Sequence, residues 1–409
     1  MKSALVSSLL FALALAGAVP KKVDYNGFKV LRVNLNEKLD KLEALEKLAT
    51  HVLNPGKASF VDVVVAPENV DAVNALSAAT VITEDVGAAL KEEGGFSAYA
   101  GSETWFTAYH SYADHLQFLR DLQAGYTSNS AIITAGTSVE GRTLTGIQIW
   151  GTGGRGSKPA VLIHGNVHAR EWITSKTVEY IAWQLLTKYS TDATVKSLVD
   201  KFDFYIVPIV NPDGFVYTQR TDRLWRKNRQ TVSSSRCVGR DINRNWPYKW
   251  DAPGGASTDP CSETYKGVAA GDAPENKGLV AQVQQLKASR GIRLYLDIHS
   301  YGQYILWPYG YDCNLRAEND AQHRNLATRA ASAIRAVSGT AYTIGPSCST
   351  LYATTGSSTD YTDVTGNSTY SYTYELRDTG KYGFSLPANQ IQPTVRETWA
   401  GIVSMLKDA

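Results

Sequence analysis

The sequence has little of several features that would place it in a special class. It contains only four cysteines in 409 residues, and its net charge is only +2. So small a charge gives no reason to expect nucleic-acid binding, which depends on many Lys and Arg side chains against phosphates. The 43% hydrophobic content, with 33 Gly and 14 Pro, is that of an ordinary globular protein. Disordered, collagen-like and coiled-coil classes are therefore excluded.

Long hydrophobic runs are absent beyond the amino terminus. There, Lys2 precedes an apolar run from Leu5 to Ala16 and small residues follow, which is the pattern of a secretory signal. A membrane anchor is the alternative, but the run is shorter than the about 20 residues that a spanning helix needs. We therefore expect residues 1–18 to be a signal peptide and the protein to be secreted, extracellular and without a membrane segment. One glycosylation triplet begins at Asn367.

The cysteines are too far apart in sequence for a zinc knuckle, which needs close pairs. In an exported protein they are expected to form disulfides. Three pairings are possible, and pairing between sequence neighbours would join Cys237 to Cys261 and Cys313 to Cys348.

Two regions differ in pattern and charge. Residues 19–100 alternate short apolar strands (28–35, 60–65) with amphipathic helices (37–51, 69–79), and they carry three more acidic than basic side chains. Residues 101–409 carry four more basic than acidic side chains. A charged, glycine-containing stretch separates the two regions, so we place the boundary at about 91–102.

The larger region is predicted to be an α/β domain. Its strands are continuous apolar runs and alternate with long helices, which indicates a sheet covered on both faces. The predicted strands are 144–150, 160–163, 204–209 and 292–298, and the predicted helices include 175–189 and 276–289. The predicted fold is a large mixed, mostly parallel sheet with helices on both faces, preceded by a small α/β open sandwich. In such sheets, ligands bind beyond the carboxyl ends of the strands.

Candidate metal ligands follow two of these strands. His168 and Glu171 stand three residues apart at a strand-to-helix turn, and His299 ends another strand. Two histidines and a glutamate leave one position open, as in catalytic zinc sites. His164 is expected to be packed or hydrogen-bonded instead, because side chains four apart on a strand do not converge as they do on a helix. His51, His110, His115 and His323 are expected to be ordinary surface or core residues.

A zinc hydrolase also needs a base and groups that hold its substrate. Glu375 ends a strand among aromatic residues and is the candidate base; the alternative is an ion pair with Arg377 or another cation. Arg244 is enclosed by asparagines and Trp246, and its guanidinium suits a carboxylate.

Five motifs in this order resemble the zinc carboxypeptidases of the pancreatic carboxypeptidase A type. They are His168-Ala-Arg-Glu171-Trp, Trp225-Arg-Lys-Asn-Arg, Asp241-Ile-Asn-Arg-Asn-Trp, Asp297-Ile-His-Ser-Tyr and Glu375-Leu-Arg-Asp-Thr-Gly. The resemblance runs from about Thr104 to the carboxyl terminus. It implies a zinc carboxypeptidase catalytic domain over 101–409, preceded by an activation propeptide over 19–100 that an activating protease removes.

The resemblance also implies the role of each site residue. One Zn²⁺ would be held by His168, Glu171 and His299, with Glu375 as general base and acid and Arg226 polarising the scissile carbonyl. The resemblance further implies that Asn243 and Arg244 bind the terminal carboxylate and that Asp241 orients His168 from behind. It places Arg170, Ser300 and Tyr301 along the substrate path, and Tyr352 as a mobile residue that covers the bound terminal residue. The resemblance supports both cysteine pairs as well.

The pocket floor that selects the terminal residue matches Thr359. A neutral floor favours apolar or aromatic termini, since a buried cation would lack a counter-charge. Asp360 is adjacent, however, and would reverse this preference if it were the floor.

The leading hypothesis is a secreted zinc exopeptidase, made as a zymogen, that acts on peptides and proteins with a free terminal carboxylate. One alternative is a non-catalytic relative that binds peptide carboxyl termini, and another is a carboxypeptidase that prefers basic terminal residues. An endopeptidase is disfavoured, because a carboxylate clamp would have no partner in mid-chain. We expect a monomer.

Overall fold

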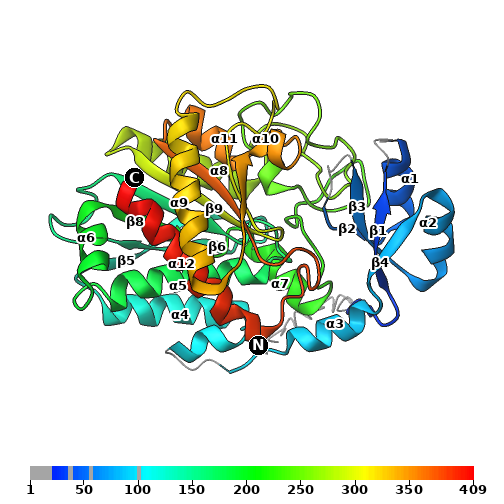
Figure 1. Ribbon diagram of the computed structural model, residues 1–409, viewed down its shortest axis with the longest axis horizontal. Helices are drawn as coiled ribbons and strands as arrows, with labels where there is room; N and C mark the ends of the chain where they lie inside the picture. The colour runs from blue at the N-terminus through cyan, green and yellow to red at the C-terminus, as the bar shows by residue number, and fades with distance from the viewer. Residues whose placement is uncertain (1–20, 36–39, 55–58, 99–102) are drawn as a thin grey trace, which may run out of the picture.

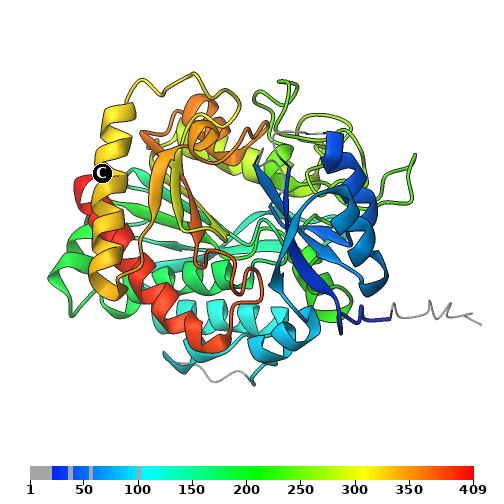
Figure 2. The same ribbon diagram turned by 45° about the vertical axis from the view of Figure 1, so that its right-hand side comes forward.

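A computed structural model describes residues 21–35, 40–54, 59–98 and 103–409. The expected signal peptide at 1–18 lies outside the described residues. The chain folds into a small amino-terminal domain packed against one side of a much larger one (Figures 1 and 2). No helix in the described part of the chain is both long and apolar enough to cross a bilayer.

The small domain is an antiparallel sheet with helices on it. Its strands lie in the order β2-β3-β1-β4. Alternate residues of β1 and β3, such as Leu31, Val33 and Val63, are buried against the helices, as a two-layer sandwich requires. The strands are β1 (Lys29–Asn34), β2 (His51–Val52), β3 (Phe60–Val65) and β4 (Ala79–Thr83), and the helices are α1 (Asp40–Leu48), α2 (Val70–Leu76) and α3 (Val86–Glu93).

The large domain is built on an eight-stranded sheet in the order β11-β10-β12-β9-β7-β8-β6-β5. The central strands β12, β9, β7 and β8 are mutually parallel, and the β10–β11 pair is parallel too. The mixed, mostly parallel sheet predicted from sequence is therefore confirmed. The strands are β5 (Ser130–Thr137), β6 (Thr143–Ile149), β7 (Ala160–Gly165), β8 (Asp203–Val207), β9 (Ile292–Ser300), β10 (Tyr304–Trp307), β11 (Thr343–Pro346) and β12 (Tyr370–Leu376).

Helices cover both faces of this sheet. One face packs on α4, α5, α6, α9 and α12, and the other on α8. The helices are α4 (Tyr112–Gly125), α5 (Trp172–Thr187), α6 (Ala193–Lys201), α7 (Pro212–Arg220), α8 (Pro274–Ala288), α9 (Asp320–Ser338), α10 (Ser347–Thr350), α11 (Ser358–Asp360) and α12 (Ile391–Asp408).

Helix α5 is buried along almost its whole length, so its polar side chains need partners inside the protein. The Lys176 ammonium lies 2.7 Å from His110 Nδ1, and Glu179 Oε1 lies 2.6 Å from His115 Nδ1. His110 and His115 are thus core residues that provide polar partners for the buried side chains of α5, in agreement with the sequence analysis. His164 is buried and hydrogen-bonded to the Tyr295 hydroxyl at 3.1 Å, as expected.

Two disulfides join sequence neighbours. Cys237 pairs with Cys261, and Cys313 pairs with Cys348. Both lie in loop-rich segments of the large domain, where a cross-link limits the freedom of the unfolded chain.

Candidate active site

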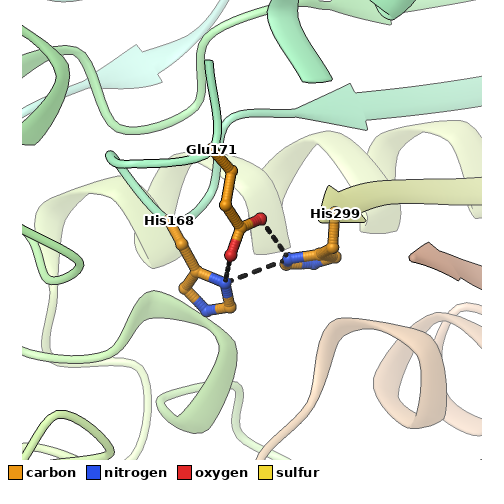
Figure 3. A group of neighbouring side chains, drawn as sticks. All are labelled: His168, Glu171 and His299. Carbon is orange, nitrogen blue, oxygen red and sulfur yellow. Dashed lines mark hydrogen bonds and ion pairs between the residues drawn. The ribbon is translucent and has the colours of Figure 1, made fainter. Parts of the chain in front are cut away.

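Three buried donor groups meet beyond the carboxyl ends of β7 and β9. His168 Nδ1 lies 2.8 Å from Glu171 Oε1, and His299 Nδ1 lies 3.0 Å from His168 Nδ1 and 3.2 Å from Glu171 Oε2 (Figure 3). One ligand atom from each of the three residues lies within 4.8 Å of the other two. Two imidazole nitrogens and a carboxylate directed at one point form a donor set that fits Zn²⁺.

The local backbone explains why these residues converge. Strand β7 ends at Gly165, where a Cβ would come within 2.8 Å of Val178 on α5, so only glycine lets the helix pack this closely. Asn166 then adopts a left-handed conformation (φ 49°), and its N–H donates to the Thr174 hydroxyl at 2.8 Å. The chain therefore turns sharply between strand and helix and presents His168 and Glu171 on one side.

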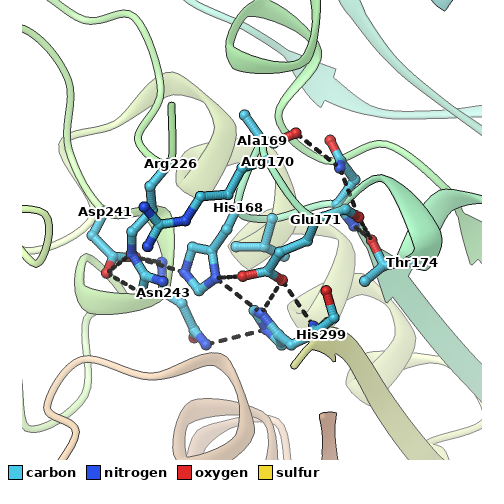
Figure 4. Close-up of polar contacts among 12 residues, drawn as sticks. His168, Ala169, Arg170, Glu171, Thr174, Arg226, Asp241, Asn243 and His299 are labelled. Atoms are coloured by element: carbon cyan, nitrogen blue, oxygen red, sulfur yellow. Dashed lines mark hydrogen bonds and ion pairs between the residues drawn. The ribbon is translucent and has the colours of Figure 1, made fainter. Parts of the chain in front are cut away.

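A carboxylate lies behind each histidine. His168 Nε2 is 3.1 Å from Asp241 Oδ1 (Figure 4). His299 Nε2 is 3.0 Å from Asp297 Oδ2. The sequence analysis did not assign a role to Asp297. Its position two residues before His299 on a strand was the available signal, because residues i and i+2 share a face of a strand.

Arg226 also belongs to this network. Its Nη2 donates to Asp241 Oδ2 at 2.7 Å and its Nε to the same oxygen at 3.2 Å. Burial raises the pKa of Asp241, but Arg226 and His168 outweigh burial and hold that pKa well below its usual value. Asp241 is therefore a fixed negative charge between a guanidinium and a candidate metal ligand.

Glu375 stands beside the ligand set on the neighbouring strand. Strand β12 pairs with β9 so that Glu375 is opposite His299, and both residues line a cavity of about 290 Å³. Burial raises the pKa of Glu375 to about 8, against the lowering effect of His299. A bound cation would oppose this rise. A carboxyl that takes and releases a proton near neutral pH suits a general base.

The candidate clamp residues line the same cavity. Asn243 Oδ1 accepts from Ser358 N at 2.8 Å, which fixes the side-chain amide. Arg244 donates from Nε to Gly255 O at 2.6 Å and from Nη1 to Asn243 O at 2.9 Å. The remaining predicted residues that also line the cavity are Arg226, Ser300, Tyr301, Tyr352 and Thr359.

At the pocket end of the cavity, the Thr359 hydroxyl pairs with the Thr373 hydroxyl at 2.6 Å. The neighbouring Asp360 carboxylate accepts from Gly310 N at 3.0 Å with both oxygens. Burial raises the pKa of Asp360 to about 7, so this carboxyl is a weak source of negative charge.

The small domain covers this cavity. Arg32, Leu53, Asn54, Phe60 and Asp62 line it together with the ligand set. The fully buried Arg170 donates from Nη2 to Val52 O at 3.1 Å and to Leu53 O at 3.4 Å. Sequence reasoning placed Arg170 on the substrate path but had no means of pairing it with the small domain.

Comparison with known proteins agrees with this geometry, which is that of a zinc hydrolase. Residues 115–401 match the zinc carboxypeptidase family. The chain is 44% identical over 420 residues to metallocarboxypeptidase A of Trichophyton rubrum, covering 100% of this chain and 99% of that protein. It is 37% identical to carboxypeptidase A2 of Mus musculus, covering 75% of this chain and 72% of that protein.

Solved structures give the same result. The crystal structure of thrombin activatable fibrinolysis inhibitor matches with a TM-score of 0.84 and 28% identity, over 93% of this chain and 98% of that one. Carboxypeptidase A from Helicoverpa armigera matches with a TM-score of 0.83 and 27% identity, over 94% and 98%. The chain belongs to the zinc carboxypeptidase family. It is a metallocarboxypeptidase, a hydrolase whose cofactor is zinc.

Proposed function

We propose that this protein is a secreted exopeptidase, made as a zymogen, that removes the terminal residue from peptides and proteins with a free carboxyl terminus. The observation that carries this proposal is the shared cavity. It brings Glu375 and the His168, Glu171 and His299 set together with Asn243 and Arg244. A base beside a metal site explains hydrolysis, and a cationic clamp in the same cavity explains why the last bond is chosen.

Zinc, when bound by His168, Glu171 and His299, supplies a Lewis acid that polarises the scissile carbonyl and acidifies water. The protein supplies the proton transfers. Glu375 takes a proton from the attacking water and returns it to the leaving amine. Arg226 lies in the same cavity, and its guanidinium stabilises negative charge that develops on the carbonyl oxygen.

Substrate orientation falls to Asn243 and Arg244, which bind the terminal carboxylate, and to Tyr352, which closes over the terminal residue. Arg170, Ser300 and Tyr301 hold the chain that leads to the scissile bond. Thr359 forms the pocket floor, and the preferred terminal side chains are apolar or aromatic. The hydroxyl pair with Thr373 and the weakly acidic Asp360 support this preference, because a buried Lys or Arg terminus would find no full counter-charge there.

The amino-terminal domain is proposed to be the activation propeptide, with its boundary at about 91–102. Its residues line the cavity, and an ion pair between Glu93 and Arg223, with Nε to Oε2 at 2.7 Å, anchors its end on the large domain. Separating the two partners would leave an unpaired charge in a buried position, which is strongly unfavourable. The small domain should therefore stay in place until another protease cleaves the chain and frees the cavity.

The test is release of the terminal residue from blocked dipeptides that end in Phe, Leu, Lys, Arg or Glu. Release is measured before and after limited proteolysis, with and without a zinc chelator. Chelator-sensitive release of Phe or Leu after cleavage alone is the expected result. Preferential release of Lys or Arg would contradict the assignment of Thr359. No release from the zinc-loaded, cleaved protein would favour a non-catalytic binder of carboxyl termini.

A further inference from the structure

A histidine of the small domain sits in an acidic notch of the large domain. His51 Nδ1 lies 2.9 Å from Glu263 Oε1, and His51 Nε2 lies 3.2 Å from Asp222 Oδ2. The Tyr25 hydroxyl, also from the small domain, donates to Asp222 Oδ1 at 2.6 Å. The imidazole is buried, and each of its ring nitrogens faces a carboxylate of the large domain.

The segment that carries His51 leads into the cavity of the candidate active site. Two and three residues further on, Leu53 and Asn54 line this cavity together with the metal ligands. The carbonyls of Val52 and Leu53 accept from the Arg170 guanidinium, as the backbone of a bound peptide would. The segment therefore occupies the space that an extended peptide needs as it leads away from the scissile bond.

The notch itself is built by the large domain. Asp222 Oδ1 also accepts from Leu224 N at 3.0 Å, which holds this carboxylate in place. Glu263 follows Cys261, whose disulfide to Cys237 restrains the loop. Neither of these restraints involves the small domain, so the large domain by itself holds the Asp222 carboxylate and the loop that carries Glu263.

Two cations lie close to the notch, and their effect must be weighed. Arg170 Nη1 is 3.6 Å from Glu263 Oε1, and Lys227 donates from Nζ to Pro260 O at 2.6 Å. Burial lowers the pKa of Lys227 to about 8, so this side chain is still mostly charged at neutral pH. Burial also lowers the pKa of His51, yet Asp222 and Glu263 outweigh burial and raise it to about 9. At the imidazole, the two carboxylates therefore have a larger effect than burial.

We propose that Asp222 and Glu263 form a subsite of the cleaved enzyme that binds a cationic side chain of the substrate, Lys or Arg, on the amino-terminal side of the scissile bond. In the uncleaved chain, the His51 side chain occupies this subsite. The inference rests on the proposed function, since it requires both peptide hydrolysis and removal of the small domain. It concerns the upstream part of the peptide and is independent of the terminal residue that Thr359 selects.

The test uses the cleaved, zinc-loaded enzyme and blocked hexapeptides that end in Phe. A single Lys is moved through the three positions that precede the scissile bond, and matched peptides carry Glu or Ala there. At one position the Lys peptide should have a kcat/KM about fivefold or more above the Glu peptide. The difference should shrink as ionic strength rises, because solvent screens an open notch.

The variants are Asp222→Asn, Glu263→Gln and the double substitution. Each should reduce the Lys-to-Glu ratio of kcat/KM, mainly through KM, and the double variant should bring it close to one. The control is Asp408→Asn, which removes an exposed acid at the end of α12 that is paired with Arg329 on α9 and should leave the ratio unchanged. Both peptides are measured on one preparation, so the ratio does not depend on the fraction of folded enzyme.

Two failures can be told apart. If the Ala peptides are hydrolysed with chelator sensitivity but Lys and Glu peptides react equally at all three positions, the subsite is disproved and the proposed function stands. If no peptide is hydrolysed, the proposed function itself fails. A Lys preference that survives the double substitution would also overturn the assignment to Asp222 and Glu263.

Discussion

Glu375 and His299 stand opposite each other on adjacent parallel strands, in the register that joins β12 to β9. The base and one metal ligand are thus fixed by the same backbone ladder. A sheet holds its side chains more rigidly than a loop does, so the fold sets the distance between the Glu375 carboxylate and the metal site.

Replacing Glu375 by Gln should abolish turnover and leave the metal in place. The amide keeps the size of the side chain but cannot accept a proton, so kcat should fall by about 10²-fold or more. Steady-state kinetics and zinc content by elemental analysis check both parts. Near-normal activity in this variant would show that another group is the base.

Asp297→Asn should weaken zinc binding by about 10- to 100-fold, the usual effect of losing a carboxylate behind a ligating histidine. The affinity is measured by competition with a chelator, without reference to activity. The matched control is Ser358→Ala, which removes the hydroxyl that donates to Asp297 but leaves the carboxylate. Equal losses in the two variants would mean that the charge beside His299 is unimportant.

The small domain should be held more firmly at low pH. The pKa of His51 is raised from its usual 6.5 to about 9 in the closed chain, so its stabilising contribution is complete below about pH 6.5 and is lost as the pH rises through 9. Asp222 and Glu263 have lowered pKa values and stay ionised over this range. Tyr25, whose pKa is raised, stays neutral.

This dependence is measurable as the activity of the uncleaved chain on a small substrate, divided at each pH by that of the cleaved enzyme. The quotient should rise between pH 6.5 and 9. In His51→Gln it should start higher and rise much less, because Lys227 titrates in the same range with and without this histidine. A quotient that falls with pH would contradict the role of His51.

Thr359→Asp should shift the preferred terminal residue. A carboxylate beside Thr373 would give a Lys or Arg terminus the counter-charge that the pocket lacks, and it would repel a Glu terminus. The expected result is a rise in kcat/KM for Lys relative to Phe by about tenfold or more. Asp360→Asn serves as the comparison, because that carboxyl is bound to Gly310 N and should affect the preference less.

The parts that sequence could predict are those with local or repeated signals. His168 and Glu171 lie three residues apart at a strand end, and continuous apolar runs indicated a covered sheet. Helix boundaries were less accurate, since α5 begins at Trp172 and not at 175. Its first residues follow the metal loop directly, and no capping residue marks the start.

The notch around His51 could not be predicted, because its partners are far away in sequence. Glu263 is 212 residues from His51, and nothing in the residues next to either one indicates the contact. Asp297 was missed for a different reason: an acid two residues before a histidine is common, and only the three-dimensional position of His299 gives it meaning.

The hydrogen bond from Ser358 N to Asn243 Oδ1 has a consequence for peptides with modified ends. It fixes Asn243 Oδ1 toward Ser358, so the groups that Asn243 and Arg244 present to a substrate are chiefly N–H donors. A chain that ends in a carboxamide presents N–H groups of its own, and donor would then face donor. Hormone-like peptides capped in this way should resist the enzyme, whatever their last side chain.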